Sequence, residues 1–199
     1  SWQNVLGHVH EGHAAFFLGE LSSGGWWAYF PVTFLIKTPV VTLILLLIGI
    51  VVIIRHRYLW RTGAFLILPA LALIAAAMAS GLNIGYRHIL PALPFLLVVA
   101  STAVIFLKRR RITRILLLLT LVWTIIGGIR QYPDYLAYFN EITGGTDQGY
   151  RFLGDSNLDW GQDLKLLAKT IKQQEGQWSV SYAGVGDPAY YGVPEEMLL

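Results

Sequence analysis

The sequence predicts an α-helical polytopic membrane protein with about four transmembrane helices and a small extracytoplasmic α/β segment. First, 55% of its 199 residues are hydrophobic and only 14% are charged, whereas a soluble domain of this length needs more charge to cover its surface. Second, the apolar residues are gathered into long uncharged blocks. Third, arginine and lysine cluster at the ends of these blocks. Together these observations favour a membrane protein rather than a soluble protein with an unusually large apolar core.

Four uncharged apolar runs give the expected transmembrane bundle, residues 38–129. The runs cover residues 38–54, 63–80, 89–107 and 115–129. A helix of 18 or 19 residues is close to what is needed to cross the hydrocarbon core. The second and third runs form a hairpin around the polar turn 81–88. The fourth run is the shortest, about 22 Å if helical, so we expect Arg114 and Arg130 to snorkel to the surface.

The distribution of charge predicts the orientation of these helices. Residues 55–61 and 108–114 contain eight of the fifteen basic residues and none of the twelve acidic ones. The remainder carries seven basic against twelve acidic residues, a net charge of −5. Cytoplasmic loops are enriched in Lys and Arg, so the two basic segments are predicted to be cytoplasmic in a bacterial plasma membrane. The partners expected from this pattern are membrane lipids and not nucleic acid.

The two polar flanks, residues 1–37 and 130–199, are therefore expected outside the cytoplasm. The first is predicted to be a loop and an interfacial segment, because Trp26, Trp27 and Tyr29 are typical of an aromatic belt. We expect Lys37 to snorkel toward the surface and Pro39 to lie in the first turn of the next helix.

The C-terminal flank has a β-α-β-α pattern. Its expected elements are a strand at 150–153, a helix with the capping box Asp159 to Gln162 that ends at Gly176, a strand with alternating Trp178, Val180 and Tyr182, and a helix opened by Asp187-Pro188.

Arg87 and His88, next to Tyr86, are the candidate phosphate-binding residues. They lie in the expected outer turn between two spanning helices, at the depth of a lipid headgroup. The guanidinium offers a rigid fork of donors to phosphate oxygens, and the imidazole adds a second donor. The alternative is that Arg87 only anchors a helix end at the interface, where arginines are common.

Metal binding has weaker candidates. His8, His10 and His13, with Glu11, form an H-x-H-E-x-x-H cluster in which two imidazoles and a carboxylate are ligands that zinc accepts. The spacing matches no dedicated zinc signature, so polar loop histidines are the alternative. The run 155–161 lacks the glycine and glutamate of a calcium loop and is interpreted as a helix cap and turn. No metal site is assigned, although a divalent metal is left open as a cofactor.

Several stretches together resemble one family. They are residues 19–39 with Gly25-Trp26-Trp27-Ala28-Tyr29-Phe30-Pro31, residues 86–91 with Tyr86-Arg87-His88-Ile89-Leu90-Pro91, residues 136–141 with Tyr138-Phe139-Asn140-Glu141, and residues 155–164 with Asp155-Ser156-Asn157-Leu158-Asp159-Trp160-Gly161-Gln162. This order of motifs resembles the bacterial phospholipid-carrier-dependent glycosyltransferases of the family 39 type. Those enzymes are similar to protein O-mannosyltransferases and lipid A aminoarabinose transferases.

The resemblance implies a C-type glycosyltransferase fold and an inverting transfer of a sugar from a polyprenyl-phosphate donor. The acceptor would be a lipid, a glycan or a protein at the outer face of the membrane. It also implies that Arg87 binds the donor phosphate and that an acidic base lies in an outer loop upstream of Ser1, so no catalytic residue is assigned here. We expect this chain to be a C-terminal fragment that is inactive alone. The alternatives are a transporter or flippase component and a non-catalytic anchor of an extracytoplasmic binding domain.

Overall fold

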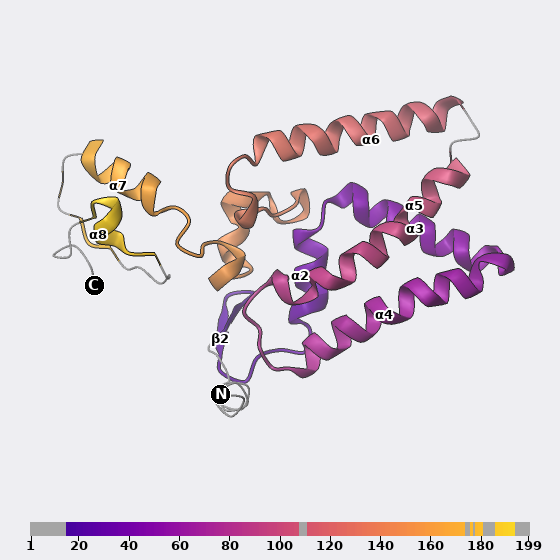
Figure 1. The fold of residues 1–199 in the computed structure, drawn as a ribbon, viewed down its shortest axis with the longest axis horizontal. Coiled ribbons are helices and arrows are strands. Elements are labelled where there is room, and N and C mark those ends of the chain that lie inside the picture. The colour runs from indigo at the N-terminus through magenta and orange to yellow at the C-terminus, as the bar shows by residue number, and fades with distance from the viewer. Residues whose placement is uncertain (1–14, 108–110, 174–175, 177, 181–185, 194–199) are drawn as a thin grey trace. The chain divides into compact units, whose positions relative to one another are not determined.

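The computed structural model describes residues 15–107, 111–173, 176, 178–180 and 186–193. It divides into two compact units, Ser1–Asn157 and Leu158–Leu199, which are described separately. The chain is mostly helical, and a two-stranded antiparallel sheet is the only sheet among the described residues (Figure 1).

The first unit opens with a β-hairpin that the sequence analysis did not predict. Strand β1, Ala15–Phe17, pairs with β2, Glu20–Ser22, across a two-residue turn. Both turn residues have positive φ, 52° at Leu18 and 94° at Gly19, as a tight hairpin requires. The hairpin is also tied to a distant segment, because Leu18 N donates to Phe152 O at 2.8 Å and Phe17 forms a bridge with Leu153.

Two helices then meet at an elbow. Helix α2, Tyr29–Lys37, and helix α3, Val40–Arg55, are bent by 112° with respect to each other. Proline lacks an N–H and disfavours the helical conformation of the residue before it. Thr38 is accordingly extended, with φ −97° and ψ 134°, and Pro39 lies at the N-cap of α3 rather than in its first turn. The predicted interfacial segment therefore ends in a helix, and the predicted span 38–54 corresponds to α3.

The remaining helices of this unit follow the predicted apolar runs. They are the 3-10 helix η1, Arg57–Leu59, α4, Trp60–Ala79, the 3-10 helix η2, Tyr86–Ala92, α5, Leu93–Leu107, and α6, Arg111–Arg130. Among the described residues, three stretches are long and apolar enough to cross a membrane: Arg57–Ala79, Tyr86–Val104 and Arg111–Arg130. The bent α2–α3 pair counts as a fourth if it is one span. The chain is thus a helical membrane protein with three or four candidate spans. Because α6 is longer than predicted, Arg114 and Arg130 belong to the helix itself.

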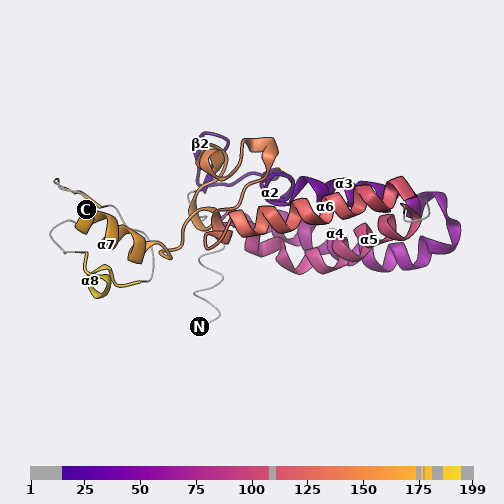
Figure 2. The same cartoon turned by 90° about the horizontal axis from the view of Figure 1, so that it is seen from above.

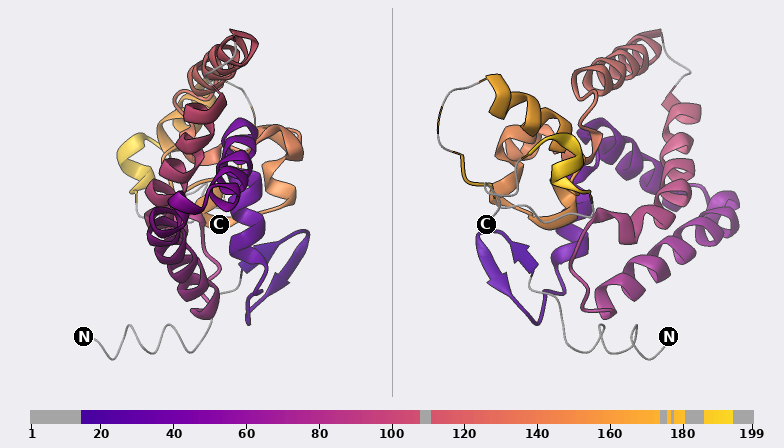
Figure 3. Two further views of the ribbon diagram at one scale, coloured as in Figure 1. Left: turned by 90° about the vertical axis from the view of Figure 1, so that its right-hand side faces the viewer. Right: turned by 60° about the vertical axis from the view of Figure 1, so that its left-hand side comes forward.

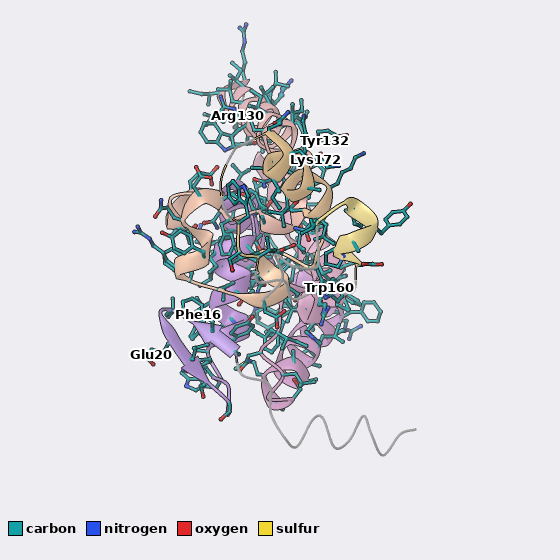
Figure 4. All side chains as sticks on the ribbon, turned by 90° about the vertical axis from the view of Figure 1, so that its left-hand side faces the viewer. Phe16, Glu20, Arg130, Tyr132, Trp160 and Lys172 are labelled. Carbon is teal, nitrogen blue, oxygen red and sulfur yellow. The ribbon has the colours of Figure 1, made fainter. Side chains whose placement is uncertain are left out.

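Helices α3, α4 and α5 pack into a small bundle (Figure 2). Its buried centre is Leu46 and Ile53 of α3 with Val99 and Ala100 of α5. Close approach depends on Gly49, since a Cβ there would lie 2.2 Å from the Val99 carbonyl oxygen. Helix α6 runs beside this bundle and buries none of its described residues (Figure 3). In Figure 4 its end at Arg130 is well away from the hairpin residues Phe16 and Glu20.

Short 3-10 turns complete the first unit. They are η3, Tyr135–Ala137, η4, Glu141–Thr143, η5, Thr146–Arg151, and η6, Asp155–Asn157. The predicted strand at 150–153 is wrong, because η5 continues to Arg151 and only Leu153 makes a single β-bridge. The interpretation of 155–161 as a turn rather than a calcium loop agrees with η6.

The second unit contains α7, Leu164–Gln173, and α8, Pro188–Tyr191, around a core of Ala168, Val180 and Val193. The predicted cap of the last helix is confirmed, because Asp187 accepts a hydrogen bond from Ala189 N at 2.9 Å.

One other prediction for this segment is wrong, and two are not tested. The box Asp159 to Gln162 does not cap α7, which begins at Leu164, since Asp159 accepts from Gly161 N at 2.7 Å instead. The described part of α7 ends at Gln173, and residues 174 and 175 lie outside the described residues, so the predicted end at Gly176 stays a prediction. Val180 is a bridge residue and Tyr182 lies outside the described residues, so the strand predicted around them also stays a prediction. The described part of 130–199 is therefore helices and turns, with single bridge residues at Leu153 and Val180.

Candidate functional site

The elbow between α2 and α3 is built on a buried lysine. Lys37 is 8% exposed, and its Nζ donates to Leu136 O at 2.8 Å and to Asn157 O at 2.6 Å. The same ammonium lies 4.5 Å from the centroid of the Phe139 ring, a distance at which the ring face attracts a cation. The prediction that Lys37 snorkels to the surface is therefore wrong, and the residue joins the end of α2 to two distant segments.

Asn140 closes the C-terminal end of α2. Its Nδ2 donates to Leu35 O at 2.6 Å and to Thr38 O at 2.7 Å, and its backbone N–H donates to Ile36 O at 2.9 Å. The last carbonyls of a helix have no partner within the helix. A side chain that is fully buried thus supplies, from over a hundred positions away, the donors that α2 lacks.

Asn157 connects three elements in a similar way. Its Nδ2 donates to Tyr29 Oη at 2.8 Å and to Gly154 O at 3.0 Å, while its Oδ1 accepts from Tyr86 N at 3.0 Å. Helix α2, the turn η2 and the turn η6 are therefore held in one register by a single buried amide.

The predicted phosphate-binding residues all lie in η2, half-buried. The hydroxyl of Tyr86 is 2.9 Å from Thr38 Oγ1. The ring of His88 is 6.2 Å from that of Phe30, and its Nε2 is buried without a hydrogen-bond partner. A buried nitrogen without a partner is costly, and His88 is not among the residues that line the cavity at this elbow. Arg87 stands between these two residues in the sequence.

A cavity of about 280 Å³ opens at the elbow. Polar groups of Lys37, Thr38 and Tyr86 line it, together with the apolar side chains Phe34, Leu46, Leu93, Leu96 and Leu97. Of the three predicted phosphate-binding residues only Tyr86 lines this cavity. A cavity with a few polar groups and an apolar remainder suits an amphiphile.

Metal ligands are not brought together in the described part of the chain. No group of three or more His, Asp or Glu side chains that could hold a metal occurs among the described residues. His8, His10 and His13 lie outside those residues, so the zinc hypothesis stays a prediction.

The four sequence stretches of the family resemblance meet at this elbow. Lys37 and Thr38 come from the first, Tyr86 from the second, Asn140 from the third and Asn157 from the fourth. Sequence reasoning identified Tyr86 but missed the lysine and the two asparagines. One pattern in the sequence could have identified Asn140: it is a polar amide within an aromatic run, Tyr138-Phe139-Asn140.

Comparisons of the chain with protein-family models, with curated proteins and with solved structures gave no significant match.

Proposed function

We propose that this chain is part of a membrane-embedded glycosyltransferase that transfers a sugar from a polyprenyl-phosphate-linked donor to an acceptor at the outer face of the plasma membrane. The observation that supports the proposal is the meeting of the four motif-bearing stretches around one polar elbow with an amphiphile-sized cavity.

The chemistry of the cavity fits such a donor. The leucines of α5 and Leu46 of α3 provide a surface for isoprenoid units, while Thr38 and Tyr86 place hydroxyl groups at the other end. In the proposed complex the phosphate lies at η2, within reach of Arg87 and His88. The ammonium of Lys37 is already shared between two carbonyl oxygens, so its role is to hold the elbow rather than to contact the phosphate.

In the proposed reaction an acceptor oxygen forms a bond to the anomeric carbon while the bond from that carbon to the phosphate oxygen breaks. The electron pair leaves with the lipid phosphate, and the acceptor proton goes to a base that we do not assign to any described residue. Negative charge therefore increases on the phosphate in the transition state. A fixed guanidinium at that position stabilises the transition state more than the ground state.

Replacement of Arg87 tests the proposal. In the full-length protein, reconstituted in vesicles with a polyprenyl-phosphate sugar, Arg87→Ala should lower the rate of sugar transfer by about 10²- to 10³-fold, the usual effect of losing one charge-stabilising donor. Arg87→Lys should retain part of the rate, because it keeps the charge but not the fork.

The control is Arg57→Ala, which removes an exposed arginine from η1 and should leave transfer unchanged. Equal rates for Arg87→Ala and the unmodified protein would contradict the proposed site. Movement of labelled donor between leaflets without any glycosylated product would support a flippase instead.

A further inference from the structure

A second site lies on the other side of the first turn of α3. A cavity of about 260 Å³ is lined by Trp123 of α6, by Tyr135 and Tyr138, and by Glu141 of η4. Pro39 lines both this cavity and the one at the elbow. Glu141 is the only charged residue among its described lining residues, so this cavity is acidic and aromatic. The cavity at the elbow, in contrast, is lined by Lys37 and by apolar side chains.

The cavity continues along α6. A neighbouring cavity of about 490 Å³ shares Val41 and Thr124 with the first, and is lined mainly by apolar residues that include Leu45, Leu117 and Leu121. From Gln131 in the first cavity to Leu117 in the second, α6 rises by about 21 Å. One leaflet of a bilayer with its headgroup is also about 20 Å thick. The two cavities together therefore have the length of one leaflet-embedded lipid.

The end of this groove has the chemistry of an ammonium site. Glu141 Oε1 accepts a hydrogen bond from Trp123 Nε1 at 3.1 Å, which fixes the carboxylate beside the indole. Burial, with the nearby Glu141 carboxylate as the smaller cause, raises the pKa of Tyr138 to about 12, so this phenol stays neutral and keeps its proton. A fixed carboxylate next to neutral aromatic rings attracts a cation.

We propose that the groove between α3 and α6 binds a phospholipid whose headgroup carries a primary ammonium. The ammonium lies at Glu141 among Trp123, Tyr135 and Tyr138, and one acyl chain follows α6 toward Leu117. An α-helix is 10–12 Å across with its side chains, too wide for cavities of these volumes, whereas a single acyl chain fits them. The proposal does not depend on sugar transfer, because Trp123, Tyr138 and Glu141 do not line the cavity at the elbow.

Photo-crosslinking tests the occupant. The full-length protein is reconstituted in vesicles that contain phosphatidylethanolamine with a photoreactive acyl chain, or phosphatidylglycerol with the same chain, and labelled peptides are mapped by mass spectrometry. We expect about fivefold stronger labelling of the peptide 117–124 by the ammonium lipid. Equal labelling by both lipids would overturn the proposal in favour of a non-selective lipid shell. Absence of label from this peptide would also overturn it, because another part of a protein would then fill the groove.

Two substitutions make the test specific. Glu141→Gln removes the charge but keeps an acceptor for Trp123, and should lower labelling by the ammonium lipid to the level of phosphatidylglycerol. The matched control Asp147→Asn, at an exposed position of η5 that lines neither cavity, should change nothing.

Gly127→Leu fills the groove, because no atom lies within 4 Å of a Cβ built at that position. It should abolish labelling by both lipids and leave the α-helical circular dichroism signal intact. A preference for the ammonium lipid that survives Glu141→Gln, or labelling by either lipid that survives Gly127→Leu, would overturn the assignment.

Discussion

At the scale of single residues, the contacts of Lys37 determine that its charged side chain stabilises the elbow. Its Nζ is held by two backbone carbonyls and an aromatic ring, none from its own helix. A buried charge is tolerated only when hydrogen bonds satisfy it. Lys37 therefore links the end of α2 to residues 136 and 157 and makes the elbow sensitive to a single substitution.

We predict that Lys37→Met lowers the free energy of unfolding of the first unit by about 2–4 kcal/mol, because it leaves two carbonyl oxygens without a donor. The measurement is unfolding in detergent followed by circular dichroism, with proteolysis of residues 134–157 as a local readout. Arg55→Met, at the exposed end of α3, is the control and should cost less than about 0.5 kcal/mol. Similar losses for both variants would show that the buried contacts of Lys37 are unimportant.

Residue-level prediction from sequence reached only part of this site. Tyr86 was identified because the polar turn around it is flanked by two apolar runs, a local pattern. Lys37 was expected at the surface because a lysine beside a hydrophobic run usually extends there. Its partners lie 99 and 120 positions away, and no local pattern encodes a contact of that separation. The same holds for Asn140 and Asn157.

At the scale of elements, the packing of α3 against α5 depends on a glycine. The Val99 carbonyl oxygen occupies the space where a Cβ of residue 49 would stand, and Thr102 Oγ1 lies 3.4 Å from Gly49 O. Small residues let transmembrane helices approach closely, so that backbone groups of the two helices come into contact.

We predict that Gly49→Ala destabilises the bundle by about 1–3 kcal/mol, since the added methyl group forces α3 and α5 apart. Gly128→Ala in α6 is the matched control. A Cβ there meets no atom within 4 Å, so alanine should be neutral or stabilising by up to about 1 kcal/mol because it favours the helix. Unfolding of both variants in detergent distinguishes the two effects. A neutral Gly49→Ala would mean that the helices tolerate a wider spacing.

The elements themselves were predicted unevenly, for a physical reason. Uncharged runs identified α3, α4, α5 and α6 because burial in lipid requires continuous apolar length. The strand expected at 150–153 rested on only four residues, too short a pattern to outweigh local turn formation. The hairpin β1–β2 was missed because its second strand, Glu20–Ser22, has no hydrophobic alternation. It is held instead by contacts to Phe152 and Leu153.

At the scale of the whole first unit, the contacts of the hairpin decide whether the chain crosses the membrane an even or an odd number of times. If α4, α5 and α6 each cross the membrane, three crossings separate Tyr58 from Tyr150, and the two residues lie on opposite sides. The hairpin is bonded to residues 152 and 153, so it lies on the side of Tyr150. The chain between Leu21 and Tyr58 must then cross once. A re-entrant α2–α3 pair would return the hairpin to the side of Tyr58 and is incompatible with these contacts.

In this arrangement α3 makes the crossing, and it begins at a bend of 112° from α2. Its 16 residues rise by about 24 Å, less than the roughly 30 Å of a typical hydrocarbon core. Local thinning of the bilayer accommodates a short span at modest cost, and Arg55 at its end reaches toward the headgroups.

Cysteine labelling tests the four-crossing arrangement. The chain contains no cysteine, so each introduced thiol is the single site of labelling in it. Leu21→Cys, Tyr58→Cys and Tyr150→Cys place single thiols at positions that are 77%, 72% and 56% exposed. With a maleimide that does not cross membranes, we expect intact cells to be labelled at residues 21 and 150, and residue 58 only after permeabilisation. If residues 21 and 58 were labelled under the same condition, and residue 150 only under the other, α2–α3 would be re-entrant. The elbow site, which joins α2 to residues 136–157, could not then form in the membrane.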